Sequence, residues 1–195
     1  MPAPSFAPAQ LKGKTITLRL LEPHDLGGLS SAGREVDWSW MFSSLGTLEA
    51  MQNWIEERIR DFNEGLSATF SIVLNSTGEI VGSTTYMDIR EKDRSLEIGM
   101  TWYSPSVQGT EVNPECKYLL LKHAFQQWGA IRVQLKTDHM NVHSQNAIKK
   151  LGAVFEGELR NHMIRRDGTI RHTRMYSITR EEWPDVKKKL EERLE

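Results

Sequence analysis

The fold is decided by the stretch LEIGMTWYSPSVQGTEVNPECKYLLLKHAFQQWGAIRVQLKTDHMNVHSQNAIKKLGA (96–153). Its residue pattern predicts a strand over 96–102, a helix over 114–129, a strand over 131–137 and a second helix that ends at Gly152. Because a helix that joins two neighbouring strands forms a crossover, the two strands should lie parallel in one sheet. This segment therefore predicts an α/β arrangement.

The loop between the first strand and the first helix has the features of an anion-binding site. It ends in Gln108-Gly109-Thr110-Glu111-Val112-Asn113, with Asn113 as the expected N-cap and Pro114 at the first helical position. Successive backbone N–H groups and the positive end of the helix dipole would face a bound anion there. The alternative is a plain connecting loop that ends in an N-cap.

Outside this segment, hydrophobic periodicity and turn residues predict further elements. The expected strands cover 14–21, 68–74, 79–89, 154–160 and 170–178, and the expected helices cover 25–32, 47–63, where Thr47 gives a capping signal, and 181–194. The order is β-α-α-β-β-β-α-β-α-β-β-α. We expect one domain over residues 11–195, with a flexible leader over residues 1–10.

Composition excludes several classes of protein. A net charge of −1, from 25 basic and 26 acidic residues, argues against a nucleic-acid binder held by phosphate contacts. The single cysteine, Cys116, allows no internal disulfide and favours a reducing, cytoplasmic location. No apolar run approaches the roughly 18–20 residues that span a bilayer, so no membrane is expected as a partner.

In their order and spacing, these motifs resemble the GNAT acetyltransferase superfamily. The resemblance covers roughly residues 12–185 and is carried by EIGMTWYSP, QGTEVNPECKYLLLKHAF, RVQLKTDHMNVHSQNAIKKLGA, EGELRNHMIRRDGTIRHTRMYSI and EEWP. The branch it is most similar to contains the RimJ/RimL-like ribosomal-protein N-terminal acetyltransferases.

This resemblance implies a mixed, twisted, mostly antiparallel sheet of about seven strands flanked by helices. Its central parallel strands, 96–103 and 131–137, would splay apart around acetyl-coenzyme A. The N–H groups of Gly99 and Met100 would polarise the thioester carbonyl. No metal is expected.

The resemblance also implies cofactor contacts along the phosphate loop, at Gln108, Gly109, Thr110, Glu111, Val112 and Asn113. Gln108 matches the family's motif, whereas Glu111 and Asn113 stand where the family has small residues. A carboxylate beside a pyrophosphate costs about 1 kcal/mol when both are hydrated. We therefore expect Glu111 to point into solvent.

The helix after the second strand supplies two more candidates. Asn141 stands where the family contacts the cofactor's pantetheine arm, and it also fits a helix N-cap. The tyrosine acid of many members falls on Ile148, which cannot act as an acid. Ser144 is the alternative catalytic acid, although a serine in the first turn of a helix often serves only as a cap.

The candidate base is Glu97, acting directly or through water, unless it pairs with Arg94 or Arg132. Four histidines are rival candidates, of which His162 and His172 would face each other across the Asp167-Gly168 turn. The rivals are His139, His143, His162 and His172. Cys116 aligns with the apolar stripe of its helix and is expected in the core.

Trp38, Trp40 and Met41 are expected to line the acceptor pocket, because aromatic residues in a loop clamp extended peptides. The alternative is a hydrophobic cluster beneath that loop. The expected activity is transfer of acetyl from acetyl-coenzyme A to a primary amine by direct attack, with the N-terminal α-amine of a protein or peptide favoured. The alternatives are a small amine, such as a polyamine, an amino acid or an aminoglycoside, and a non-catalytic acyl-coenzyme A binding module. The terminal helix would pack on the domain or on a second subunit of a homodimer.

Overall fold

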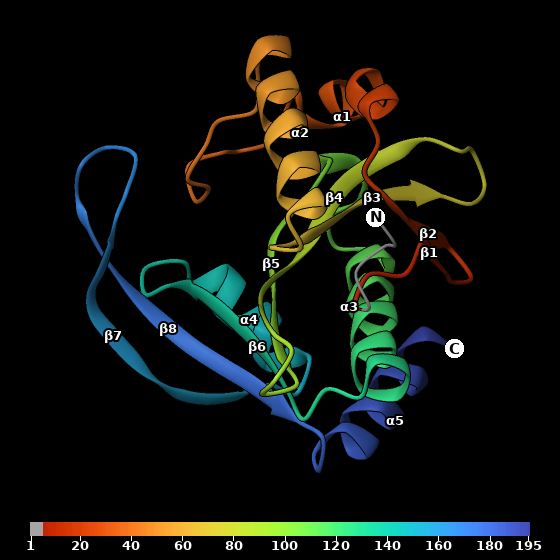
Figure 1. The fold of residues 1–195 in the computed structure, drawn as a ribbon, viewed down its shortest axis with the longest axis vertical. Coiled ribbons are helices and arrows are strands. Elements are labelled where there is room, and N and C mark those ends of the chain that lie inside the picture. Colours follow the sequence, from red (N-terminus) through yellow and green to blue (C-terminus); the bar gives the residue numbers. More distant parts are fainter. Residues whose placement is uncertain (1–5) are drawn as a thin grey trace.

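The computed structural model describes residues 6–195, which form one eight-stranded sheet with helices around it (Figure 1). The strand order is β1-β2-β3-β4-β5-β6-β8-β7. The strands are β1 (Gln10–Lys12), β2 (Ile16–Leu20), β3 (Ala68–Leu74), β4 (Ile80–Arg90), β5 (Ser95–Tyr103), β6 (Arg132–Asp138), β7 (Val154–Ile164) and β8 (Ile170–Thr179).

The helices follow the predicted order. They are α1 (Leu26–Gly33), α2 (Leu48–Asn63), α3 (Val112–Lys122), α4 (Val142–Lys150) and α5 (Trp183–Leu194). A π-helical segment, His123–Trp128, continues α3 up to Gly129, whose left-handed φ of 78° ends the helix. None of the helices over residues 6–195 is long and apolar enough to cross a membrane.

The predicted mixed sheet is confirmed, with one strand more than the seven expected. The additional strand, β1, has three residues, too few for a period-2 pattern to emerge. Residues 1–5 of the expected leader lie outside the described part of the chain. In the remainder, Phe6 and Ala7 are buried in the core and Gln10 begins β1, so residues 6–10 pack on the domain.

The central pair β5–β6 is the one parallel pair in the described sheet. It is short: the last paired residues are Glu97 and Gln134, although β5 runs on to Tyr103 and β6 to Asp138. The two strands therefore splay after this point, as the family resemblance implied.

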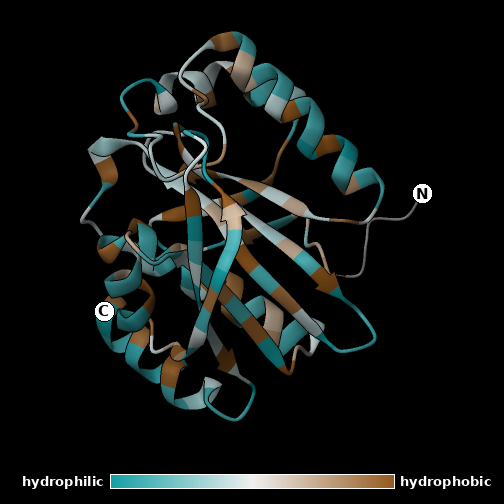
Figure 2. Cartoon of the chain, turned by 90° about the vertical axis from the view of Figure 1, so that its left-hand side faces the viewer, coloured by the Kyte–Doolittle hydropathy of each residue, from teal (hydrophilic) through white to brown (hydrophobic). Residues whose placement is uncertain are grey.

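The apolar core consists of two clusters. The larger one packs α3, α4 and α5 against the sheet, and the smaller one packs α1 and α2 around Trp38, Met51, Trp54 and Trp102. Figure 2 shows apolar and polar residues alternating along the helices and strands that enclose these clusters. Cys116 is fully buried in the larger cluster, as expected.

The side-chain caps expected at Thr47 and Asn141 are confirmed. Thr47 accepts a hydrogen bond from Ala50 N, and Asn141 accepts one from Ser144 N. The cap expected at Asn113 was wrong: α3 begins at Val112 with Glu111 as its N-cap, two residues before Asn113. Asn113 instead accepts a hydrogen bond from the Tyr103 hydroxyl, which ties the helix start to the end of β5.

The terminal helix α5 packs on the domain rather than standing free. Val186 and Leu190 are buried in the larger cluster, the Trp183 ring stacks on Phe125, and the Tyr118 hydroxyl on α3 donates to Glu191. The expected homodimer therefore stays a prediction that this helix does not support.

Candidate active site

The site is built around the point where β5 and β6 separate. Beyond the Glu97–Gln134 pair, each strand has an edge without a strand partner, so its backbone groups are available to a bound chain. The strands pair normally with their outer neighbours, β4 and β8. Beyond this vertex the sheet has a gap in its backbone pairing, called the slot below, where an extended ligand could hydrogen-bond to either strand.

A β-bulge in β5 marks the same place. Ser83 pairs with Trp102 and Thr85 with Gly99, so β5 has one residue more than β4 across this step. Met100 holds a left-handed φ of 49° there, a conformation that costs energy for a non-glycine residue. The bulge lies at Gly99 and Met100, the two residues expected to bind the thioester carbonyl.

The loop before α3 offers unused backbone donors. Gly109, with φ 79°, turns the chain toward the helix. Within residues 6–195, no group accepts a hydrogen bond from four N–H groups of this loop and the first helical turn, those of Gly109, Thr110, Glu111 and Asn113. Free N–H groups at a helix N-terminus are the donors that bind phosphate, which fits the predicted cradle.

The side chains of this loop lie as the cradle requires. Glu111 is exposed, in agreement with the expectation that its carboxylate points into solvent. Gln108 donates to the Tyr103 carbonyl at 3.3 Å, and Thr110 accepts from Val112 N while donating to the Val107 carbonyl. Val112 itself is buried and anchors the first turn.

A buried lysine lies behind the cradle. Lys117, on the second turn of α3, is 7% exposed and donates to Thr101 Oγ1 at 2.6 Å. Thr101 Oγ1 is also 2.8 Å from Thr84 Oγ1. Burial lowers the pKa of Lys117. No carboxylate in the described chain forms an ion pair with it, so an anion bound in front of α3 would be its natural partner.

The start of α4 presents a hydroxyl and an amide near the vertex. Asn141 Oδ1 caps the helix at 2.9 Å from Ser144 N, which leaves its amide Nδ2 free to donate. The Ser144 hydroxyl has no hydrogen-bond partner in the described residues and is half-buried. Ser144 therefore does not cap the helix, because Asn141 fills that role. Ile148 lies in the core.

Glu97 lies at the vertex and is almost fully buried. Its Oε2 is 3.1 Å from Lys136 Nζ and accepts from Gln134 Nε2 at 3.0 Å. The suggested partners were wrong: Arg94 binds the Trp128 carbonyl and Arg132 binds Glu156. A Cβ at position 99 would lie 2.8 Å from Met87 Sδ and 2.9 Å from Glu97 Oε1, so these two side chains would have to shift to admit one.

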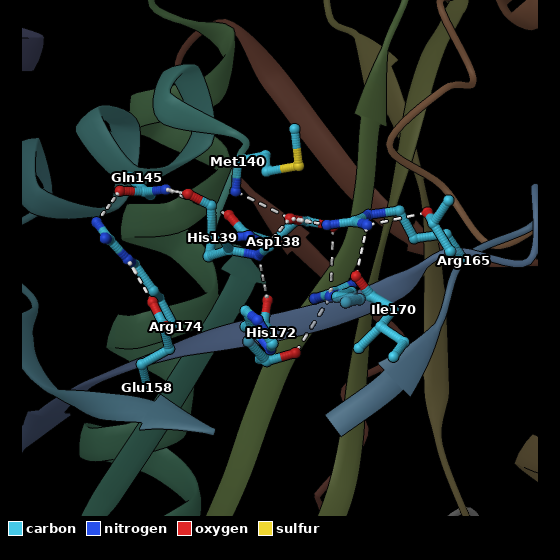
Figure 3. A network of polar contacts seen from close by, with 12 residues as sticks. Asp138, His139, Met140, Gln145, Glu158, Arg165, Ile170, His172 and Arg174 are labelled. Atoms are coloured by element: carbon cyan, nitrogen blue, oxygen red, sulfur yellow. Dashed lines mark hydrogen bonds and ion pairs between the residues drawn. The ribbon is translucent and has the colours of Figure 1, made fainter. Parts of the chain in front are cut away.

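Further along β6, Asp138 organises a polar network with the β7–β8 hairpin (Figure 3). Arg165 binds the Asp138 carboxylate with two nitrogens, at 2.7 and 2.9 Å, and Met140 N donates to it. These contacts hold the pKa of Asp138 below its usual value, although burial opposes them. Asp138 is therefore a structural counter-ion for the hairpin.

The histidines take structural positions near this network. The rings of His139 and His172 pack together, with centroids 4.6 Å apart. His172 Nδ1 accepts from Asn161 N in an irregular segment of β7, where His162 lines the same hollow. His143 is exposed on α4. The structure shows no histidine contact with Glu97 or Ser144 among the described residues.

A small pocket lies between the α1–α2 loop and the β7–β8 hairpin, and it is the candidate acceptor pocket. Trp40 and Met41, two of the three residues expected at the acceptor site, line it together with Ser39, Phe42, Asp138, Arg165, Arg166 and Arg171. Trp38 does not: it is 7% exposed, bonds the Gly33 carbonyl and packs edge-on against Trp102. For Trp38 the alternative of a hydrophobic cluster beneath the loop is correct.

Sequence reasoning missed three charged residues that the fold brings to the site. They are Lys117 behind the cradle, Arg171 in the acceptor pocket and Arg58, whose Nη1 lies 3.6 Å from Met100 Sδ at the bulge. Lys117 and Arg58 lie next to the apolar stripes of their helices. A charged residue at such a half-buried helix position was the signal in the sequence that could have identified them.

Comparisons with known proteins agree with this geometry. A family described as acetyltransferase (GNAT) domain matches residues 15–154. A protein from T. thermophilus assigned as an acetyltransferase is 32% identical, with a TM-score of 0.85, covering 97% of this chain and 98% of that one. No curated protein matches the chain.

Two more distant structures share the fold. A GCN5-related N-acetyltransferase from Brucella melitensis has a TM-score of 0.91 at 22% identity, covering 100% of this chain and 89% of that one. RimJ from Mycobacterium smegmatis, in complex with CoA-disulfide, has a TM-score of 0.79 at 21% identity, covering 91% of this chain and 88% of that one.

Proposed function

This chain belongs to the GNAT acetyltransferase family, and we propose that it transfers acetyl from acetyl-coenzyme A to the N-terminal α-amine of a protein or peptide. The observation that carries the proposal is the slot at the β5–β6 vertex, with a phosphate cradle at the start of α3 beside it. The fold it shares with RimJ supports placement in the RimJ/RimL-like branch.

The residues present fit acetyl-coenzyme A, the acetyl donor of this family. The free N–H groups of the α3 loop and the Lys117 ammonium would hold its phosphates and the chain next to them. The amide of Asn141 would donate to the pantetheine arm in the slot. The bound cosubstrate supplies an activated acetyl group, and the N–H groups at the Met100 bulge would stabilise its carbonyl oxygen.

An α-amine suits this site better than a lysine side chain. At pH 7.5 an α-amine with a pKa of about 7.7–8.0 is neutral roughly a quarter to a third of the time, whereas a lysine side chain is neutral about once in a thousand. The only buried carboxylate at the vertex in the described chain, Glu97, is already paired with Lys136. A substrate that needs little help from a base fits such a site.

In this proposal Glu97 receives the proton that the amine loses, directly or through a water molecule. The Ser144 hydroxyl, which has no partner within the described chain, donates a proton to the departing thiolate or holds the water that does. Much of the rate would come from holding the two reactants together at the vertex.

Calorimetric titration of acetyl-coenzyme A followed by a thiol-release assay tests the proposal. The assay compares short peptides with free α-amines, the same peptides with blocked N-termini and a lysine side chain, and small amines such as spermidine. Release on free α-amines alone supports the proposal. Release on small amines alone would show a small-molecule enzyme, and binding without release would show a non-catalytic module.

A further inference from the structure

The acceptor pocket contains an arginine whose charge the protein does not fully use. Arg171, on β8, is 6% exposed, and its Nε donates to Thr173 Oγ1 at 3.1 Å. In the described part of the chain, no group accepts a hydrogen bond from either of its terminal nitrogens. These nitrogens are not among the fully buried unpaired atoms of the described chain, so they reach the surface of the pocket, where an anionic ligand can bind them.

The nearest carboxylate is already committed to another cation. Asp138 binds Arg165 through two short hydrogen bonds and lies 3.9 Å from Arg171 Nε. Glu97 is also within Coulombic reach of Arg171, but it is paired with Lys136. Arg166 adds a further positive charge to the pocket, partly offset by the exposed Asp37. The pocket as a whole therefore has an excess of positive charge.

The opposite wall holds Arg171 in place without neutralising it. The Phe42 ring, from the α1–α2 loop, lies 5.0 Å from the guanidinium carbon. Arginine stacked on an aromatic ring keeps its N–H groups in the plane of the fork, free for a carboxylate. The two elements that frame the pocket thus present a planar, pre-oriented binding group for an anion.

The distance between Arg171 and the vertex sets the size of the acceptor. Gln134, Lys136 and Asp138 are alternate residues of β6 and so share a face, with Glu97 contacting the first two. At about 3.3 Å per strand residue, Asp138 lies about 7–13 Å along the strand from these contacts. Arg171 adjoins Asp138, and an extended peptide covers about 7 Å in two residues.

We propose that Arg171 binds a carboxylate on the acceptor, one or two residues from the amine that is acetylated. This inference rests on the proposed function and names the substrate class. The carboxylate is the side chain of an Asp or Glu at the second position of a peptide, or the α-carboxylate of a dipeptide. The chemistry is the same, and the substrates below distinguish the two sources.

The test compares matched acceptors in the thiol-release assay. The peptide pair is Ala-Asp-Ala-Ala-amide and Ala-Asn-Ala-Ala-amide, which differ in one charge, and the small pair is the dipeptide Ala-Ala and its amide. Wild-type protein should favour the acidic member of one pair by at least about tenfold in kcat/KM. Preference within the peptide pair identifies an acidic side chain, and preference within the small pair identifies an α-carboxylate.

The protein variants are Arg171→Gln and Arg171→Lys. The matched control is Arg180→Gln, because Arg180 is an exposed arginine in the β8–α5 turn. Arg171→Gln should reduce the preference to about twofold or less, mostly through KM. Arg171→Lys should restore part of it, and Arg180→Gln should leave it unchanged. Calorimetric binding of the two peptides to the variants gives a second readout that does not depend on turnover.

Equal kcat/KM within both pairs in the wild-type protein would overturn the inference while leaving the proposed function intact, because the neutral acceptors would still react. A preference that survives in folded Arg171→Gln would also overturn it. If Arg171→Gln does not fold, the wild-type comparison and Arg171→Lys decide. Absence of thiol release on every acceptor, with no difference in peptide binding, would remove both the proposed function and this inference.

Discussion

Glu97 Oε2 lies 3.1 Å from Lys136 Nζ at the last residues where β5 and β6 are paired. The carboxylate is 1% exposed and the lysine side chain 23%. A paired, buried carboxylate at the vertex of the splayed strands can have either a chemical or a structural role. The two roles predict different kinetics.

Replacing Glu97 by Gln keeps the shape of the side chain and removes its ability to take a proton. If Glu97 is the base, kcat at neutral pH should fall about a hundredfold or more, while the affinity for acetyl-coenzyme A changes little. Steady-state kinetics and calorimetry measure these two quantities. Glu156→Gln is the control, since Glu156 also pairs with a cation of β6, Arg132, but at a more exposed site. An unchanged kcat would assign Glu97 a structural role.

Replacing Lys117 by Met should weaken acetyl-coenzyme A binding about tenfold or more without lowering the stability of the free protein. The variant loses the Lys117 ammonium, which we propose as a partner of the cosubstrate's phosphates, yet a buried methionine carries no desolvation cost. Because burial lowers the folded-state pKa of Lys117 below its unfolded value, charging this lysine opposes folding. Stability of the wild-type protein relative to the variant should therefore rise with pH up to about 10.5.

Calorimetry and urea unfolding measure both effects, with Lys122→Met on the same helix as the control. A destabilised variant that binds acetyl-coenzyme A normally would contradict this role for Lys117.

Asn141→Ala and Thr47→Ala should each lower the free energy of unfolding by about 1 kcal/mol, because each removes a side-chain cap on a helix. Only Asn141→Ala should also raise the KM for acetyl-coenzyme A, since the free Asn141 amide is the group that we propose contacts the pantetheine arm. Thermal unfolding and steady-state kinetics of the two variants separate the loss of a cap from the loss of a ligand contact. Equal KM values in both variants would mean that Asn141 serves only as a cap.

His123 should make the protein less stable in mild acid. Burial lowers the pKa of His123 to about 4, from about 6.5 in the unfolded chain. Between these values the unfolded chain takes up a proton that the folded protein does not, so stability falls as the pH drops from 6.5 to 4. The loss is at most about 3.5 kcal/mol, for about 2.5 pH units at about 1.4 kcal/mol each.

Urea unfolding at several pH values between about 4 and 7 measures this loss. His123→Gln should lack this component of the acid sensitivity, whereas His24→Gln, at an exposed site, should keep it. Identical slopes for the wild-type protein and His123→Gln would show that the histidine is protonated in the folded state.

The sequence by itself determined the features that depend on neighbouring residues. Hydrophobic periodicity and turn residues predicted the order of the elements, and the short polar side chains of Thr47 and Asn141 predicted two helix starts. The N-cap at Asn113 was wrong because tertiary contacts, here the Tyr103 hydroxyl, offered that side chain a competing partner. Strand β1 was missed because it is stabilised by pairing with β2 and not by a local pattern.

Only the tertiary structure decided how the charged residues of the site are paired. Glu97 could have bound any of several nearby cations, and the parallel register of β5 and β6 brought Lys136 to it. Likewise, Trp38 and Trp40 are two residues apart, yet one packs in the core and the other lines the pocket with Arg171. Such contacts join residues far apart in the chain, so they follow from strand register and packing, which local sequence patterns do not encode.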